Sequence, residues 1–332
     1  MCLNTVRSTI LGMGMAVPPK VLTNHDLEKI VETSDAWITE RTGIKERHIL
    51  EDGENISQYA IKASKEALER AGISPEDLNL IICATVTPDY LIPSLAVLVQ
   101  EGLGASRAGA FDLSATCSGF VYALSIADQF IKANPEWKIL VVGAEALSRK
   151  TNWQDRSICV LFGDGAGAAV VGKSTKPSQK GIIDFILGAD GSKWPLLTLK
   201  GGGSAFPPFD DRLPREEYYI KMQGREVFKF ATRVMEKIAL ELLERNGFSK
   251  EDLDLLVPHQ ANLRIIEYLR DRLNLPKEKV FVNIDKYGNT SAASIPIALY
   301  EAEKKGVLKE GDLVLLVAFG GGFTFGGVLL RW

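Results

Sequence analysis

The chain repeats part of itself, and this repeat limits the possible folds more than any other feature. Residues 68–82 (LERAGISPEDLNLII) recur in the second half as residues 243–257 (LERNGFSKEDLDLLV). At the same offset, residues 139–142 (ILVV) are matched by residues 314–317 (VLLV). The long repeat contains a helix end, a turn and a buried strand in the same order. It predicts two similar α/β halves, and the alternative is a coincidence of common helix and strand residues.

The hydrophobic pattern predicts where the halves meet and which elements they contain. We place the junction at residues 174–179, which gives an N-terminal half 1–174 and a C-terminal half 175–332. Residues 201–217 form a long polar loop that we expect near a functional surface. The expected helices are 24–30 (capped by Asn24), 34–43, 56–71, 94–103 and 225–246, and the expected strands are 9–16, 78–84, 109–113, 138–143, 157–162, 165–171, 253–257 and 280–284.

Cys117 lies where a predicted strand turns into a predicted helix. After it, apolar residues recur at helical spacing from Phe120 to Ile131. A thiol at a helix N-terminus faces the positive end of the helix dipole and unpaired N–H groups, which lower its pKa. The position suits a nucleophilic cysteine, but a small buried core cysteine would fit this stretch equally well.

Two polar residues of the second half occupy comparable places. His259 follows the repeated strand, and Asn289 follows Cys117 at nearly the offset of the repeat, at a turn after the predicted strand 280–284. Because open α/β sheets bind ligands at the carboxyl ends of their strands, we expect these three residues to meet in one crevice. Taken singly, His259 could be a structural histidine and Asn289 only a helix N-cap.

These residue types suit acyl transfer through cysteine. That chemistry needs a thiolate, an acid–base or hydrogen-bond partner, and donors for a developing oxyanion. The glycines 320–322 would add N–H groups that a ligand can approach closely, unless they serve only a tight strand crossing. On matched ends of a duplicated fold, the combination favours a catalytic site over separate structural roles.

Composition narrows the class of partner and the compartment. A net charge of −3 argues against nucleic acid as the main partner. The four cysteines have no paired spacing, and with only three histidines we expect neither a disulfide framework nor a metal site. No apolar run reaches the ~20 residues of a membrane span, and no convincing signal peptide is present. We therefore expect a reduced, cytoplasmic protein.

Over essentially its whole length the chain resembles β-ketoacyl-acyl-carrier-protein synthase III, the priming condensing enzyme of dissociated fatty acid synthesis. The resemblance implies a thiolase-like α/β fold, in which two pseudo-twofold-related halves form a layered αβαβα arrangement. It also implies decarboxylative condensation of an acyl-CoA primer, acetyl-CoA by default, with malonyl-acyl-carrier protein, which gives a 3-oxoacyl-carrier protein, CO₂ and CoA without a cofactor. The segments that carry it are 34–37 (SDAW), 111–120 (FDLSATCSGF), 258–264 (PHQANLR), 288–291 (GNTS), 320–322 (GGG) and 323–332.

The resemblance also implies a role for each matching residue. Cys117 would be the nucleophile, with its own N–H and that of Gly321 as the oxyanion hole. His259 and Asn289 would bind the malonyl thioester oxygen and stabilise the enolate, since loss of CO₂ requires no strong base. The other matches are Trp37, Arg41, Arg156 and Asn262 for CoA and its pantetheine arm, Leu147 and Ile92 for the acyl pocket, and Lys229 and Arg264 for the carrier protein. Ile92 would reach the pocket from the partner subunit of a homodimer.

Other functions use similar residues and stay open at this point. A cysteine thioester hydrolase would share Cys117, His259 and Asn289, and a relative from secondary metabolism would condense another acyl pair. A non-catalytic binding module is disfavoured because all three reactive positions are present. Two related enzyme classes are set aside. Thiolases use a second cysteine near the C-terminus as a base, and no cysteine follows Cys159 here. Elongating condensing enzymes use two histidines, and Asn289 stands in the position of the second one. The segment 162–167 (FGDGAG) is a strand connection rather than a phosphate loop. Primer preference does not follow from the sequence.

Overall fold

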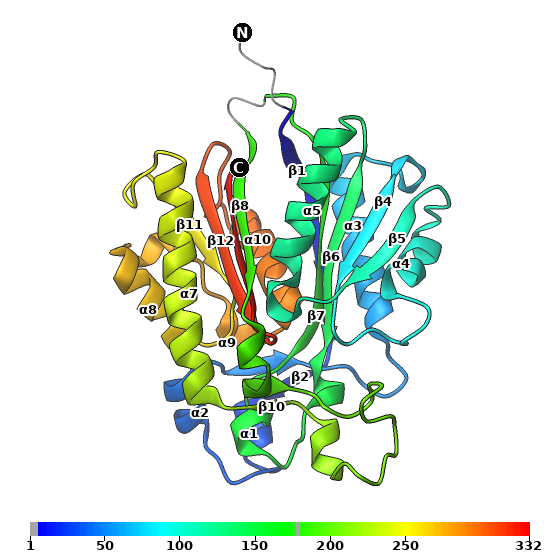
Figure 1. Cartoon of the computed structure of the whole chain (residues 1–332), viewed down its shortest axis with the longest axis vertical. Coiled ribbons are helices and arrows are strands. Elements are labelled where there is room, and N and C mark those ends of the chain that lie inside the picture. Colours follow the sequence, from blue (N-terminus) through cyan, green and yellow to red (C-terminus); the bar gives the residue numbers. More distant parts are fainter. Residues whose placement is uncertain (1–5, 177–179) are drawn as a thin grey trace.

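Two β-sheets form the centre of the molecule. The computed structural model describes residues 6–176 and 180–332 (Figure 1). The first sheet has the order β1-β7-β6-β4-β5 and the second the order β11-β12-β13-β8. The strands of the first sheet are β1 (Ser8–Ala16), β4 (Leu80–Ala84), β5 (Gly109–Leu113), β6 (Ile139–Ala146) and β7 (Asp164–Lys173). Those of the second are β8 (Gly181–Ala189), β11 (Leu255–Pro258), β12 (Leu313–Gly320) and β13 (Thr324–Arg331).

Helices cover both sheets from outside and fill the space between them. Helices α5 (Gly119–Ala133) and α10 (Ser294–Lys304) bury apolar side chains against strands of both sheets. Helices α3 (Ile56–Ala71) and α4 (Leu95–Leu103) cover the outer face of the first sheet. Helices α7 (Gly224–Arg245) and α8 (Leu263–Leu273) cover the second (Figure 1). The five layers agree with the predicted αβαβα arrangement.

The repeat in the sequence corresponds to equivalent elements in space. β4 and β11 are separated along the chain by the offset of the sequence repeat, and so are α5 and α10. The short turns before these helices, η2 (Thr116–Ser118) and η7 (Ser291–Ala293), have the same offset. Thr116 and Ser291 both adopt left-handed backbone conformations, with φ of 46° and 48°. The residue equivalent to Cys117 is therefore Ala292, and the predicted equivalence with Asn289 is wrong.

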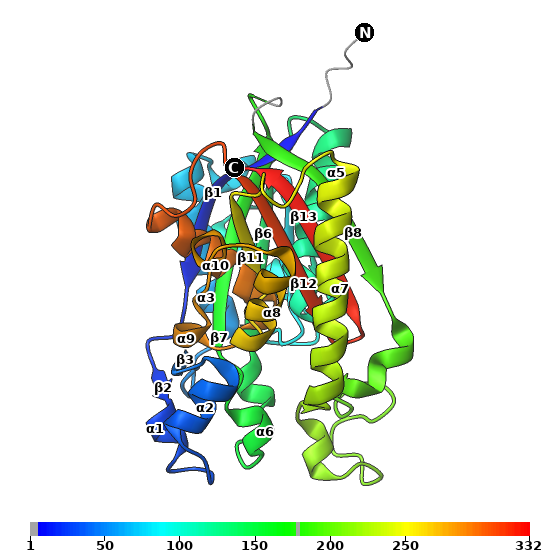
Figure 2. The same ribbon diagram turned by 90° about the vertical axis from the view of Figure 1, so that its left-hand side faces the viewer.

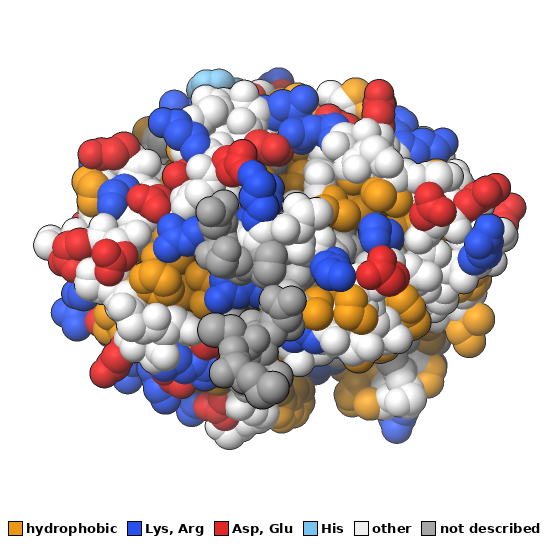
Figure 3. Space-filling view, turned by 90° about the horizontal axis from the view of Figure 1, so that it is seen from above, with side chains coloured by type: hydrophobic (Ala, Val, Ile, Leu, Met, Phe, Trp, Pro, Cys, Tyr) orange, Lys and Arg blue, Asp and Glu red, His pale blue; other side chains and the backbone are white. Residues whose placement is uncertain are grey.

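A group of short elements lies at the end of the molecule opposite the termini (Figures 1 and 2). It includes β2 (Val21–Thr23), α1 (Asn24–Leu27), α2 (Asp35–Thr42), β3 (Glu46–His48) and α6 (Arg156–Cys159), with β9 (Leu197–Thr198) and β10 (Lys221–Met222) beside them. The fully buried Arg47 joins part of this group to the body, because its guanidinium donates to Leu22 O, Asn24 Oδ1 and Val160 O. On the opposite end, acidic and basic side chains are intermixed (Figure 3).

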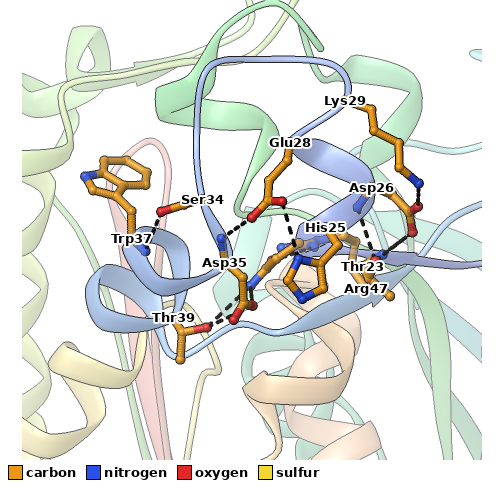
Figure 4. Close-up of polar contacts among 11 residues, drawn as sticks. Thr23, His25, Asp26, Glu28, Lys29, Ser34, Asp35, Trp37, Thr39 and Arg47 are labelled. Atoms are coloured by element: carbon orange, nitrogen blue, oxygen red, sulfur yellow. Dashed lines mark hydrogen bonds and ion pairs between the residues drawn. The ribbon is translucent and has the colours of Figure 1, made fainter.

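Three predicted element assignments are wrong. Residues 157–162 contain the end of the one-turn helix α6, which Asp155 caps, and Phe162 makes only an isolated bridge to Asn289. Residues 280–284 contain a single bridge at Val280 before the short helix α9 (Ile284–Tyr287). Thr23, not Asn24, caps α1 through a capping box with Asp26 (Figure 4). β-Branched and aromatic runs favour strands, but the pairing of residues 157–162 and 280–284 does not extend beyond a single bridge in each.

The predicted junction at residues 174–179 lies partly outside the described residues, which omit 177–179. The division into halves 1–174 and 175–332 therefore stays a prediction. In the described ranges, none of the helices has the length and apolar character needed to cross a membrane. The same ranges contain no cluster of side chains suited to hold a metal ion.

Candidate active site

Cys117 lies on the tight turn η2 between β5 and α5, and a loop of the other half holds this turn. Thr324 Oγ1 donates to Ala115 O (2.8 Å), and Thr116 Oγ1 donates to Gly321 O (3.0 Å). A Cβ atom at Gly320 would overlap Thr116 Oγ1 and the backbone N of Cys117. A glycine at position 320 is therefore required for the close approach of β12 to the cysteine turn.

The Cys117 thiol is not a ready-made thiolate. Burial raises its pKa to about 12, and a hydrogen bond with the Ser291 side chain opposes this effect only in part. The expected low pKa is wrong because the sulfur lies between the two sheets, where desolvation disfavours a charge. Cys117 therefore starts as a neutral thiol, and its proton must leave while the sulfur attacks an electrophile.

His259 presents one unpartnered nitrogen to the site. It follows β11, its backbone N–H donates to Val317 O (2.8 Å), and its side chain is almost fully buried. Nδ1 contacts Ser294 Oγ at 2.6 Å, whereas Nε2 is buried with no partner among the described residues. Burial lowers the pKa of His259 to about 3, so the imidazole is neutral at physiological pH. If the Ser294 hydroxyl donates to Nδ1, the ring carries its proton on Nε2 and can donate it to a ligand.

Asn289 has one end of its amide fixed. Its Oδ1 accepts the backbone N–H of Ser291 (2.8 Å), and its own N–H donates to Leu161 O (2.8 Å). The Nδ2 group remains available as a donor. Cys117, His259 and Asn289 line one cavity of about 660 Å³, so the structure brings together the three residues that the sequence predicted.

The same cavity contains most of the residues predicted for CoA and the carrier protein. Trp37, Arg41, Asn262, Lys229 and Arg264 all line it. Arg156 is not among the lining residues, but its guanidinium lies 4.7 Å from the centre of the Trp37 ring. Trp37 belongs to α2, whose start is capped by the Ser34 side chain (Figure 4).

Several of these side chains also have local structural partners. Asn262 caps α8 by accepting the Arg264 N–H (2.9 Å) and donates to Arg41 O (3.1 Å). Lys229 pairs with Glu226 at 2.9 Å on the exposed face of α7. Arg225 also lines the cavity and was not predicted, since nothing separates it in sequence from other surface arginines.

A second cavity, of about 400 Å³, also reaches Cys117. Its lining is mainly apolar and includes Val86, Leu91 and Leu147, together with Gly321. Leu147 therefore lies where the acyl pocket was predicted. Ile92 does not line this cavity and is 90% exposed, so its predicted role in a partner's pocket stays a prediction.

Comparison with known proteins identifies the family. The family model described as 3-oxoacyl-(acyl-carrier-protein) synthase III matches residues 111–191, and the model of its C-terminal region matches residues 243–332. The β-ketoacyl-(acyl-carrier-protein) synthase III of Caldanaerobacter subterraneus subsp. tengcongensis is 53% identical, over 98% of both chains. The chain belongs to the β-ketoacyl-acyl-carrier-protein synthase III family. Family members are acyltransferases whose condensation reaction initiates fatty acid biosynthesis, so the predicted family and enzyme class are confirmed.

Solved structures of a synthase III and of a priming β-ketosynthase confirm the thiolase-like fold. The crystal structure of the Aquifex aeolicus enzyme has a TM-score of 0.91 and 54% identity, and covers 98% of this chain and 100% of that one. The priming β-ketosynthase of the R1128 polyketide biosynthetic pathway has a TM-score of 0.90 and 36% identity, with 100% and 98% coverage.

Proposed function

We propose that the chain condenses an acyl-CoA primer with malonyl-acyl-carrier protein, with Cys117 as the nucleophile. The observation that carries this proposal is the position of Cys117 between two cavities. One cavity contains the donors His259 and Asn289 and the basic side chains, and the other is mainly apolar. A nucleophile in this position can hold an acyl chain on one side while a second thioester enters from the other.

In the first step the thiol attacks the primer thioester. The acyl chain would occupy the apolar cavity beside Leu147. The N–H groups of Cys117 and Gly321 would stabilise the oxyanion, a role supported by the contact of the Gly321 segment with the cysteine turn. CoA then leaves through the larger cavity.

In the second step the two neutral donors act on the malonyl thioester. His259 Nε2 and Asn289 Nδ2 would donate to its carbonyl oxygen as CO₂ departs, which stabilises the enolate. The enolate carbon then attacks the Cys117 thioester. A neutral histidine suits this role, because it donates a hydrogen bond without needing to change its charge.

The mouth of the larger cavity offers cationic and aromatic contacts for CoA. Trp37 and Arg156 would hold the adenine, Arg41 a phosphate, and Asn262 the pantetheine arm. For the adenine to lie between Trp37 and Arg156, the guanidinium must move off the ring that it covers here. Lys229 and Arg264 would contact the acidic carrier protein, together with Arg225.

We also propose that the enzyme is a homodimer joined at β5. This strand is the outer strand of its sheet and therefore has an unpaired edge. Five large apolar side chains are exposed on it or on the neighbouring segments: Tyr90, Leu91, Ile92, Val97 and Phe111. A second copy would cover them and would bring Ile92 towards the neighbour's acyl pocket. A cytoplasmic location is supported by these substrates and by the free thiols of Cys83, Cys117 and Cys159.

Mass spectrometry of the intact protein tests the reaction. Acetyl-CoA should add one acetyl group to Cys117, and malonyl-acyl-carrier protein should then remove it as acetoacetyl-carrier protein forms. An adduct only with a longer or branched acyl-CoA would keep the mechanism and change the primer. No adduct with any acyl-CoA would overturn the nucleophile assignment.

Two alternative functions predict different products. A thioester hydrolase would release free acid and thiol without CO₂ or a β-ketoacyl product. A secondary-metabolism enzyme would prefer another acyl pair, an alternative supported by the 36% identity with the R1128 priming β-ketosynthase. A panel of primers separates that function from the initiation of fatty acid synthesis.

A further inference from the structure

Glu145 is a buried carboxylate that the proposed reaction leaves without a role. It is the seventh of eight residues in β6, and the other seven are apolar residues or glycine. Its side chain is inaccessible to solvent. Because a buried charge is costly unless it is well hydrogen-bonded, its partners should show what it does.

The partners of Glu145 are donors, among them the backbone N–H of Ala292 and four groups within hydrogen-bond distance. Oε2 accepts from Thr87 Oγ1 (2.5 Å), Val86 N (3.1 Å) and Thr85 Oγ1 (3.3 Å). Oε1 accepts from Ser291 Oγ at 3.0 Å. The first three partners belong to the segment after β4, and the fourth belongs to η7 of the other half. Glu145 therefore lies between the segment after β4, which lines the apolar cavity, and η7, the turn that is equivalent to the cysteine turn.

Ser291 connects Glu145 with Cys117. The turns η2 and η7 pack against each other. The side chains of Cys117 and Ser291 both line the apolar cavity. The Ser291 side chain is also a hydrogen-bond partner of the thiol. A serine hydroxyl has a single proton, which Ser291 donates to Glu145. Donating this proton to the sulfur instead is what lowers the pKa of Cys117. Ser291 can therefore exchange protons with both groups, and the three side chains form a chain from sulfur to carboxylate.

We propose that Ser291 and Glu145 take up the thiol proton when Cys117 acts as the proposed nucleophile. As the sulfur electron pair forms the new C–S bond, the thiol proton passes to Ser291 Oγ, and the Ser291 proton passes to Glu145 Oε1. The C–S bond to CoA breaks, and CoA leaves as a thiolate that is protonated by water. Ser291 touches the reacting atom, whereas Glu145 is a positioning residue that acts through it.

The second step returns the proton. When the enolate attacks the acyl group, the bond to Cys117 breaks and its sulfur leaves as a thiolate. Ser291 then donates to the sulfur and is reprotonated by Glu145, which restores the starting state. The relay therefore never places the Cys117 thiolate and the Glu145 carboxylate together in this buried region, which limits the cost of desolvation.

Burial raises the pKa of Glu145 to about 7, which suits a proton acceptor at neutral pH. His259 is a poor alternative, since burial lowers its pKa to about 3 and Ser294 occupies its Nδ1. Among the described residues, Cys117 is the titratable group that faces Glu145. On the neighbouring β7, Asp164 is bound by Leu50 N and Ser148, and Lys150 lies exposed at the rim of the apolar cavity.

Alkylation of Cys117 by iodoacetamide tests the relay without any acyl substrate, so it stays interpretable if the proposed condensation fails. Quantifying the modified Cys117 peptide separates it from the other cysteines. For the wild type, the rate should rise with an inflection near pH 7. Both Glu145→Gln and Ser291→Ala should remove that inflection and lower the rate at pH 8 by at least about tenfold, the scale of general-base assistance.

The two variants distinguish the relay from simpler roles. Ser118→Ala removes a neighbouring hydroxyl that bonds Thr324 and should keep the wild-type profile. If Ser291→Ala keeps the inflection while Glu145→Gln loses it, Glu145 acts without Ser291 and the relay is wrong. If both keep it, Glu145 has only a structural role. If Glu145→Gln fails to fold, the milder Ser291→Ala variant still tests the relay, because loss of its inflection near pH 7 supports the relay and retention contradicts it.

An infrared difference spectrum gives an independent readout. Acylation of Cys117 should produce the carbonyl band of a protonated carboxylic acid, because the proton remains on Glu145 until condensation. The band should be absent from Ser291→Ala and Glu145→Gln. An acylated wild type with no such band would overturn the proposal.

Discussion

At the residue scale, the three predicted site residues differ in which cavity they line. Cys117 belongs to both cavities, whereas His259 and Asn289 line only the larger one. Their free donors, Nε2 and Nδ2, are oriented by bonds that occupy Nδ1 and Oδ1. This arrangement supports the proposal that the two donors act on the malonyl thioester rather than on the thiol.

This arrangement predicts that His259→Ala and Asn289→Ala impair condensation and spare acylation. Removing one such donor should lower the rate of 3-oxoacyl-carrier-protein formation by about 10²–10³. Acetylation of Cys117, followed by mass spectrometry, should stay within a few-fold of wild type. His25→Ala, which removes an exposed histidine, is the matched control and should change neither step. Equal loss of both steps would contradict the separation of roles.

The buried His259 also makes a prediction about stability. Its pKa is about 3 in the folded protein and near 6.5 when unfolded, so between these values the unfolded chain binds more protons. Its contribution to stability is present above pH 6.5 and is lost as the pH falls towards 3. The free energy of unfolding should drop by about 2 kcal/mol between pH 7.5 and pH 5 from this group.

Urea unfolding of the wild type and His259→Gln over this pH range measures the effect. The variant has no imidazole and should show a shallower dependence on pH, whatever its absolute stability. Identical slopes for the two proteins would show that His259 is not buried in its neutral form.

The sequence predicted the three residues proposed to act on the substrates, but it did not predict Ser291 or Glu145. Cys117, His259 and Asn289 each follow a recognisable turn signal. Ser291 and Glu145 lie far apart in the chain, and their contact depends on how the two halves pack. One local signal was present, since Glu145 is the only charged residue in the otherwise apolar β6.

At the element scale, the cysteine turn depends on its contact with the glycine segment of the other half. Gly320→Ala would place a Cβ atom on Thr116 Oγ1 and Cys117 N, which are held by backbone and cannot move cheaply. We expect at least a tenfold slower acylation and a stability loss of about 1–3 kcal/mol, typical of overpacking. Acylation kinetics and urea unfolding measure the two effects.

Gly191→Ala is the control for this prediction. A Cβ there meets no atom within 4 Å, and Gly191 lies at the start of η4 (Gly191–Leu196), outside both cavities. It should behave as wild type. A fully active Gly320→Ala enzyme would show that the cysteine turn tolerates displacement.

Elements with a clear amphipathic pattern were predicted with correct bounds, and short ones were not. The predicted helix 56–71 coincides with α3, and 225–246 differs from α7 by one residue at each end. Both are long enough for their periodicity to decide the assignment. Residues 157–162 and 280–284 are short apolar runs, in which tertiary pairing decides between strand and turn.

At the scale of the whole molecule, duplication has produced halves with different chemistry. The turn equivalent to η2 carries Ser291 and Ala292 where the first half has Thr116 and Cys117. In the proposed mechanism the first half supplies the nucleophile, and the second supplies His259 and Asn289. The sequence repeat predicted the two halves, but only the structure showed which residue is equivalent to Cys117. Asn289 and the true counterpart Ala292 lie within one helical turn of each other in sequence, so the pattern did not distinguish them.

The exposed edge of β5 predicts how the whole molecule assembles. Phe111→Lys places a charge on the edge strand and should convert the proposed dimer to a monomer, measured by light scattering after gel filtration. Phe130→Lys is the matched control, since Phe130 is similarly exposed (37% against 36%) but packs on Trp137 in another part of the surface. This control should remain a dimer.

Dissociation should also change primer selection. Leu91 lines the apolar cavity, and the next residue, Ile92, is exposed. In the proposed dimer, Ile92 of each subunit would close the apolar cavity of the other. A monomeric Phe111→Lys enzyme should therefore keep iodoacetamide alkylation of Cys117 but discriminate less between acetyl-CoA and longer acyl-CoA primers. Competition between two primers, with the acyl-enzymes resolved by mass, measures the ratio directly. An unchanged ratio in a proven monomer would show that the primer is selected within one chain, by residues such as Leu147.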